Sequence, residues 1–226
     1  MAMSVSDAIK ARKSCRAFTD EPVDAALVTD LLEQAAWAPS GGNVQPWRVW
    51  VLAGDDLDAF TARIVELRGE FPMGQGPEYD VYPPELWEPY RTRRFSNGEQ
   101  LYASIGIERA DKPGRIGQFG KNFEFFGAPM ALLIGIERRM GPPQWSDVGM
   151  FLQSFMLLAV ENGLATCAQE AWTSWHEAAY EMLDMPDDVM LFCGIAIGHE
   201  DTEHPINNWR SDRAPATEWI HQAKPK

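Results

Sequence analysis

The stretch "SDVGMFLQSFMLLAVENGL" (146–164) decides the fold class, because its apolar residues occupy every side of a helix. Such a helix must be covered all round, so we expect it in a core or an interface. Gly163 stands where a glycine ends a helix. Apolar runs on either side, "PMALLIGI" (129–136) and "VMLFCGIAIGHE" (189–200), predict buried strands. The predicted fold is α+β, with helices flanking a central sheet.

The first half of the chain predicts two further features of this fold. "WRVWVLAG" (47–54) is apolar on both alternating faces, which favours a strand at the centre of the sheet. The run 71–89, rich in Pro and Gly, predicts a long surface excursion, continued by a mostly helical stretch to residue 126. We therefore expect a helical lid over 71–126. Further helices are predicted at 5–13, at 24–38 with Asp24 as N-cap and Pro39 as its end, at 56–69 and at 175–183.

Composition limits the classes of partner and site. The length of 226 residues favours one domain, 1–226, and the net charge of −13 disfavours nucleic acids and anionic membranes. No apolar stretch is long enough for a membrane span or a secretory signal, and Cys15, Cys167 and Cys193 have no ligand-like spacing. We expect a cytoplasmic protein with buried, unpaired thiols and no metal site.

Two basic segments stand out in this acidic chain. In "RKSCR" (12–16), an extended backbone would place Arg12, Ser14 and Arg16 on one side, where they would grip a phosphate. The alternative is a surface helix that ends in basic residues. Arg210 and Arg213 belong to a tail without a core of its own, which either binds an anion or a neighbouring subunit or is simply solvated.

A third segment is the loop "APSGGNVQPW" (38–47). Its small residues, Ser40 and Gly41 among them, let backbone N–H groups approach a flat or anionic ligand, while Asn43 and Gln45 offer amides. The alternative is an ordinary turn between a helix and a strand. The chain contains no G-x-G-x-x-G, P-loop or G-x-S-x-G motif, so a Rossmann site, a nucleotide-binding P-loop and a serine hydrolase are not indicated.

The order of these segments resembles the nitroreductase family of FMN-dependent flavoproteins. Five pieces carry the resemblance over nearly the whole chain: "RKSCRAF" (12–18), "APSGGNVQPWRVWVL" (38–52), "NFEFFGAPMALLIG" (122–135), "GLATCAQEAW" (163–172) and "GIAIGHEDTEHPINNWRSDRAP" (194–215). The stretch "SIGIERADKPGRIGQFGKN" (104–122) is similar to the branch that acts on nitroaromatic compounds such as nitrobenzoates. The resemblance implies an α/β/α sandwich with a mostly antiparallel sheet and an intertwined homodimer that exchanges C-terminal arms.

The resemblance also implies the cofactor site, with FMN at the subunit interface. Three groups of residues are implied to bind it: Arg12, Lys13, Ser14 and Arg16 with Arg213 or Arg210; Pro39, Ser40, Gly41, Asn43 and Gln45 from the partner subunit; and Ala168, Gln169, Glu170 and Ala171 beside flavin N5. Ala171 replaces a glycine common in the family, and Ser211 replaces a lysine found in some members.

The implied activity is ping-pong reduction of a nitroaromatic compound by NAD(P)H through the bound FMN. Trp87, Tyr90 and Phe126 are candidates for holding a flat substrate, and Arg91, Arg93 or Arg94 for meeting its carboxylate. The same scaffold would also suit a reductive dehalogenase or an ene or quinone reductase. A noncatalytic flavin-binding protein and an acidic helical scaffold without flavin are the remaining alternatives.

Overall fold

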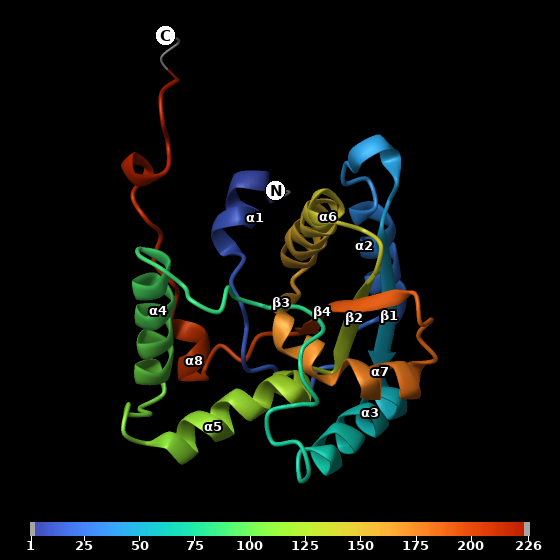
Figure 1. Ribbon diagram of the computed structural model, residues 1–226, viewed down its shortest axis with the longest axis horizontal. Coiled ribbons are helices and arrows are strands. Elements are labelled where there is room, and N and C mark those ends of the chain that lie inside the picture. The colour runs from blue at the N-terminus through green and yellow to red at the C-terminus, as the bar shows by residue number, and fades with distance from the viewer. Residues whose placement is uncertain (1–2, 224–226) are drawn as a thin grey trace.

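Four strands form one antiparallel sheet in the computed structural model, which describes residues 3–223 (Figure 1). The strands are β1 (Trp47–Ala53), β2 (Met130–Glu137), β3 (Ala165–Gln169) and β4 (Val189–Gly198), in the order β1-β2-β4-β3. The α-helices are α1 (Val5–Ala11), α2 (Ala25–Ala35), α3 (Gly54–Leu67), α4 (Tyr90–Ser104), α5 (Lys112–Gly120), α6 (Pro142–Glu161), α7 (His176–Leu183) and α8 (Pro205–Asn208). Short 3₁₀ turns are η1 (Gly41–Asn43), η2 (Lys121–Gly127), η3 (Glu170–Trp175) and η4 (Ala216–Glu218). The α+β prediction is confirmed.

The long apolar helix α6 covers one face of the sheet together with α2. Phe151 and Phe155 of α6 are fully buried against Leu132 and Ile134 of β2 and their neighbours. The helix ends in a Schellman arrangement: Gly163 has φ 77°, and the Leu164 N–H donates to the Ala159 carbonyl at 2.9 Å. The predicted end of this helix is therefore confirmed.

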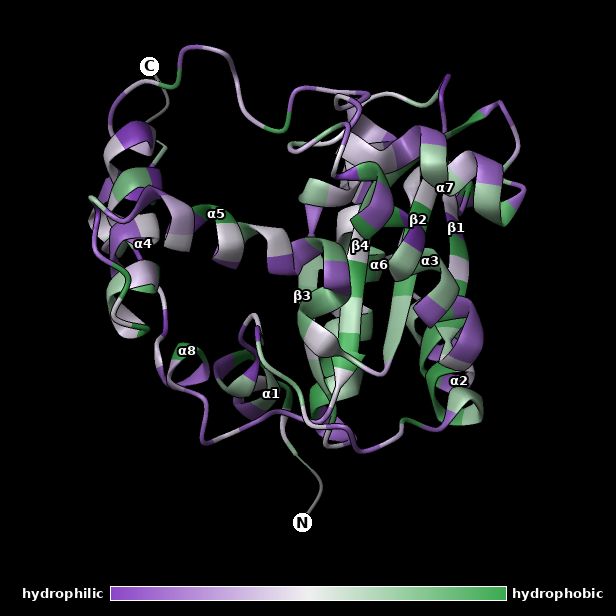
Figure 2. Ribbon diagram, turned by 90° about the horizontal axis from the view of Figure 1, so that it is seen from below, coloured by the Kyte–Doolittle hydropathy of each residue, from purple (hydrophilic) through white to green (hydrophobic). Residues whose placement is uncertain are grey.

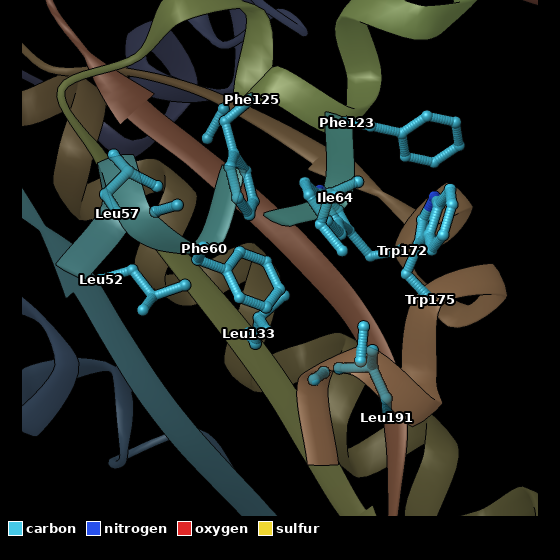
Figure 3. Packing of buried hydrophobic residues seen from close by; sticks show 14 of the residues in the cluster. Leu52, Leu57, Phe60, Ile64, Phe123, Phe125, Leu133, Trp172, Trp175 and Leu191 are labelled. Atoms are coloured by element: carbon cyan, nitrogen blue, oxygen red, sulfur yellow. The ribbon is translucent and has the colours of Figure 1, made fainter. Parts of the chain in front are cut away.

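The opposite face is covered by α3, α7, η2 and η3, whose aromatic side chains form the second half of the core (Figure 3). Trp172 of η3 lies at its centre: Phe125 stacks on it at 4.2 Å between ring centroids, and Phe123 meets it edge-on at 5.8 Å. Gly194 of β4 leaves the space for the indole, since a Cβ there would lie 2.3 Å from a Trp172 ring carbon. This packing fixes η3 against the sheet.

The predicted central position of β1 is wrong, because β1 is an edge strand of the described sheet. Its one strand neighbour is β2, and Val51 is exposed. Two apolar faces indicate helices above and below a strand, but they carry no information about its two edges. β2 and β4 take the central places instead, and nearly all their residues are buried.

Two other sequence predictions need correction. The strand β3 was missed, because its sequence "ATCAQ" is short and lacks the run of branched or aromatic residues that marks a strand. The first helix ends at Ala11 rather than residue 13, so the basic segment that follows lies outside it.

The excursion after α3 runs without helix or strand from residue 68 to 89 and then forms α4 and α5. Figure 2 shows α4 standing away from the sheet, with α5 leading back toward it. No residue of α4 is buried in this chain. Arg115 of α5 binds Glu99 of α4 through two hydrogen bonds of 2.7 and 3.0 Å, which holds the two helices together.

Replacing Gly194 by alanine tests the packing around Trp172. The added methyl group must push the indole against Phe125, so we expect Gly194→Ala to lower the free energy of unfolding by about 1–3 kcal/mol. Gly98→Ala is the matched control, because its Cβ meets nothing within 4 Å and alanine favours a helix by about 0.5–1 kcal/mol. Urea unfolding measures both, and equal stability of the two variants would contradict this packing.

Candidate functional site

The segment 12–16 is extended and runs along the edge of the sheet. Arg12 caps the end of α1, after which Ser14 forms a parallel bridge with Thr166 of β3. The Cys15 N–H donates to the Thr166 carbonyl at 2.9 Å. Of the two readings of "RKSCR", the structure therefore has the extended one, which places its side chains beside β3.

The tail returns to the same place after β4 and α8. Residues 209–213 lie next to 12–16 and close a pocket of about 190 Å³. We call it the basic pocket; it is lined by Arg12, Lys13, Ser14, Arg16, Asn97, Trp209, Arg210, Ser211 and Arg213. No acidic residue lines it. The structure thus brings the two predicted basic segments together, about two hundred positions apart in sequence, and adds Asn97 of α4, which sequence reasoning missed.

The guanidinium groups of the basic pocket repel one another. Burial, followed by the charges of Arg213 and Arg210, lowers the pKa of Arg12 from its ordinary value. Arg210 is held close by a hydrogen bond of 2.8 Å from its guanidinium to the Arg12 carbonyl. Within residues 3–223 no carboxylate lies within 4.0 Å of Arg12, Arg16, Arg210 or Arg213. Such a pocket suits a multiply charged anion.

Lys13 differs from the arginines, because its charge is already balanced. Its Nζ lies 2.6 Å from Glu200 Oε1 and donates to the Asn207 carbonyl at 2.6 Å. Asn207 itself is buried, and its side chain accepts a hydrogen bond from the Arg16 N–H at 2.8 Å. Sequence reasoning passed over Asn207, since nothing in "NNWR" distinguishes it from Asn208.

The loop 39–45 is not part of the basic pocket in this chain. It lies at the start of β1, across the molecule from α8 (Figure 1). The Gly41 N–H donates to Asp147 of α6 at 3.2 Å, and Ser40 Oγ accepts from the Gln45 N–H at 3.0 Å. Residues 41–45 are exposed, and Gly42, Asn43 and Gln45 have positive φ. Local hydrogen bonds thus hold the loop to α6 and to itself, and residues 41–45 are open to contact from outside this chain.

The segment 168–171 lies at the end of β3 and the start of η3. The Gln169 side chain is buried and donates from Nε2 to the Asn122 carbonyl at 2.8 Å, so it points into the protein. Ala168 and Ala171 are half-buried, whereas Glu170 is exposed. What this segment offers a ligand is therefore its backbone and the Glu170 side chain.

The three cysteines are free and buried, as predicted. Cys167 precedes the segment 168–171 and lies beside the basic pocket. Burial raises its pKa to about 11, although the positive charges of Arg16 and Arg12 act in the opposite direction. At neutral pH it is a protonated thiol rather than a nucleophile.

The candidate substrate residues lie in two different environments. Trp87 and Tyr90 are exposed and meet edge to face at 5.5 Å between ring centroids. Trp87 lines an open groove of about 860 Å³ beside α4. Phe126, in contrast, is buried in the core with Trp172 and Phe123, so it presents no ring at the surface of this chain. The expected substrate contact of Phe126 has no support from its position.

The three candidate arginines of the excursion also differ. Arg91 is paired with Glu88 at 2.8 Å and Arg93 with Glu218 at 2.5 Å. Arg94 has no carboxylate within 4.0 Å in residues 3–223, and its guanidinium lies 4.1 Å from the centre of the Tyr82 ring. It lines the groove that Trp87 lines.

Tryptophans near the predicted segments are mostly structural. Trp47 stacks on Phe151 at 4.9 Å and Trp172 belongs to the core, whereas Trp209 lines the basic pocket. Across residues 3–223, no three His, Cys, Asp or Glu side chains are grouped so as to hold a metal ion. No helix in that part of the chain has the length and apolar character to cross a membrane.

Comparison with known proteins agrees with this geometry. The model of the nitroreductase family matches residues 9–199. A nitrobenzene nitroreductase from Ectopseudomonas oleovorans is 38% identical over 203 residues, covering 90% of this chain and 89% of the relative. A 4-nitrobenzoate reductase from Nocardioides sp. is 38% identical over 219 residues, covering 95% of this chain and 88% of the relative.

A solved structure extends the likeness to the whole fold. The crystal structure of the FMN- and NADPH-dependent nitroreductase NfnB from Sphigopyxis sp. strain HMH is 49% identical and superimposes with a TM-score of 0.92. The match covers 98% of this chain and 100% of that one. Sequence, fold and the basic pocket lead to the same conclusion: the chain belongs to the nitroreductase family.

Proposed function

We propose that this protein binds FMN and uses NAD(P)H to reduce nitroaromatic compounds. The observation that carries the proposal is the basic pocket, in which Arg12, Arg210 and Arg213 converge without a carboxylate. A dianionic phosphate monoester is the counterion that such a set of forked donors suits best. The names of the relatives, which include a nitrobenzene nitroreductase and a 4-nitrobenzoate reductase, support the electron acceptor.

The residues present fit FMN at its phosphate end. The donor set combines three guanidinium groups with the Ser14 hydroxyl, and a bound anion would offset the burial and the neighbouring positive charges that lower the pKa of Arg12. A pocket of about 190 Å³ has room for the phosphate and adjoining polyol, but not for the flavin ring. The ring would therefore extend from the pocket, past Arg16 in its wall, toward the segment 168–171.

Bound FMN would supply the redox chemistry by accepting two electrons as a hydride and passing them to the second substrate. This chain's residues would bind and orient it. Arg16 would place a fixed positive charge at the pyrimidine edge of the ring and favour negative charge there. The backbone N–H groups of 168–171, held by the buried Gln169 side chain, would orient the region around N5. No side chain needs to act as a catalytic acid or base.

We further propose a homodimer that exchanges C-terminal arms and completes the FMN site. The loop 39–45 and the basic pocket lie at different sides of one chain, so the loop would serve the partner's pocket. Exposed apolar side chains support an interface at α1 and α6. They are Val5 and Ile9 of α1 and Met150 of α6. The open edge of β1 offers hydrogen-bonding groups to another strand.

Nitrobenzoate-like acids are the proposed acceptors. Trp87 offers an exposed aromatic face, and Arg94 lines the same groove without a carboxylate partner in the described residues. Three glutamates also line it, of which Glu88 is paired with Arg91 and Glu99 with Arg115, while Glu85 has no such partner in residues 3–223. A flat ring with a carboxylate matches that pair of groups. We also propose that the single domain 1–226 acts in the cytoplasm, where its three free thiols stay reduced.

Anaerobic titration tests the proposed chemistry. We expect the purified protein to carry a yellow flavin that NADH or NADPH bleaches and that a nitrobenzoate restores. Because donor and acceptor would use one binding site in turn, steady-state rates should give parallel double-reciprocal lines, and excess acceptor should compete with NAD(P)H. Intersecting lines, or a flavin that NAD(P)H leaves oxidised, would contradict the proposal.

Removing one guanidinium tests the phosphate site. Arg12→Met keeps the aliphatic length but loses a charge-assisted contact worth about 1.5–3 kcal/mol, so FMN affinity should fall roughly 10- to 100-fold. Arg139→Met is the control, since that side chain is 82% exposed and paired with Glu137 away from the pocket. Fluorescence titration measures the FMN affinity of both variants. Equal affinities of the two would contradict the proposal that the basic pocket binds the FMN phosphate.

A charge on the exposed face of α1 tests the dimer. Sedimentation velocity should show the unaltered protein as a dimer. Ile9→Glu should weaken the association, because a buried carboxylate at the interface has no partner. Glu161→Gln, a control on the neighbouring helix α6 that adds no charge, should stay dimeric. A monomeric unaltered protein would exclude the arrangement.

A further inference from the structure

We propose that Asn207 is the positioning residue that assembles the phosphate site, although it does not touch the ligand itself. The inference rests on the proposed FMN function and assigns a role within it. Asn207 lies in α8, between the sheet and the C-terminal arm, and is 1% exposed. It is bonded to the first basic segment, through the Arg16 N–H and Lys13 Nζ, and the second basic segment, 209–213, begins two residues after it.

Every polar atom of the Asn207 side chain is used. Oδ1 accepts a hydrogen bond from the Arg16 N–H at 2.8 Å. Nδ2 donates to the Ala17 carbonyl at 2.8 Å and to the Asp201 carbonyl at 2.9 Å. A carboxamide is the side chain that supplies one acceptor and two donors at this size. The amide therefore joins the start of the chain to the segment after β4.

The backbone of Asn207 adds a fourth connection. Its carbonyl accepts from Lys13 Nζ, whose charge Glu200 balances at 2.6 Å. Lys13 thus connects the first basic segment to α8 and to Glu200, although it lines the pocket and was expected to bind the cofactor. The charges left for an anion are those of the arginines.

Asn207 fixes these arginines from both sides. On one side it sets the backbone at Arg16 and Ala17, immediately after the Ser14 hydroxyl. On the other, α8 ends one residue later at Asn208 and the arm follows, so the positions of Arg210 and Arg213 depend on how residue 207 is held. A hydrogen bond of 2.8 Å from the Arg210 guanidinium to the Arg12 carbonyl then connects the two basic segments directly.

The adjacent asparagines provide a matched pair of variants. Asn208 has the same chemistry and lies in the same helix, but it is exposed and its side chain makes no hydrogen bond within residues 3–223. Asn207→Ala should therefore disturb the phosphate site while Asn208→Ala should not. Asn207→Asp keeps the size and the acceptor for Arg16 but removes both donors, so it serves where the alanine variant fails to fold.

Comparison of FMN with riboflavin, which lacks the phosphate, separates positioning from general damage. Dissociation constants of both flavins are measured by fluorescence for the full chain freed of flavin. For Asn207→Ala and Asn207→Asp we expect the FMN constant to rise about tenfold or more, the effect of one charge-assisted contact. The riboflavin constant should change less than about twofold, and Asn208→Ala should resemble the unaltered protein on both flavins.

Each outcome decides the matter. Loss of preference for FMN over riboflavin at position 207 alone supports the inference. An equal rise of both constants means a merely structural role and overturns it, as do unchanged constants. If the unaltered protein binds neither flavin, the proposed function fails, and this inference fails with it. If the unaltered protein binds both flavins and the variants at position 207 still prefer FMN to the same degree, only this inference is overturned.

Discussion

The gathering of arginines, one of them partly buried, in a pocket without a carboxylate is the constraint on which the candidate site depends. A chain with a net charge of −13 has ample carboxylates, yet none lies within 4.0 Å of Arg12, Arg210 or Arg213 in the described residues. Burying the Arg12 guanidinium, and placing it beside the charges of Arg213 and Arg210, costs free energy, and both effects lower the pKa of Arg12. An anionic ligand that binds only the folded state would offset this cost and stabilise the folded protein. The arginines of the basic pocket thus lower the stability of the protein locally until an anion binds them.

The sheet separates the basic pocket from another segment that the sequence predicted to bind the cofactor, the loop 39–45. The segment 12–16 runs beside β3, one edge strand, and the loop 39–45 precedes β1, the other edge strand. Three strand spacings separate the edges, which is about 14 Å at about 4.8 Å each. The hydrogen-bonded strand pairs β1-β2, β2-β4 and β4-β3 set this separation. The two segments therefore lie at opposite edges of the sheet within one chain, which is why the proposed site includes a second copy of the chain.

Much of the fold follows from periodicity in the sequence, and what did not follow has physical reasons. The apolar pattern gives α6, β2 and β4, because burial of those residues depends on their own faces. The edge position of β1 depends on which strands lie beside it, and β3 is a run of small residues whose pairing with β4 decides its structure. Both are properties of partners distant in sequence.

The residues of the candidate site also divide into those that the sequence predicted and those that only the folded structure reveals. Arg12, Arg210 and Arg213 were predicted, because basic residues are conspicuous in an acidic chain and their order resembles a known family. Asn207 was not, since two adjacent asparagines differ only after the chain has folded and buried one of them. The Asn207 side chain bonds to backbone atoms, which every residue has, and so its partners leave no pattern in a single sequence.

The arginines outside the pocket show that its lack of carboxylates is specific to the site. All but Arg48, Arg94 and Arg109 have a carboxylate within 4.0 Å in the described residues, in pairs such as Arg115 with Glu99. Arg94 and Arg109 lie over aromatic rings instead. The acidic surface thus neutralises most of its own cations one by one and leaves the largest unpaired group in one pocket. That contrast focuses the positive potential where an anionic cofactor would bind and keeps it low elsewhere.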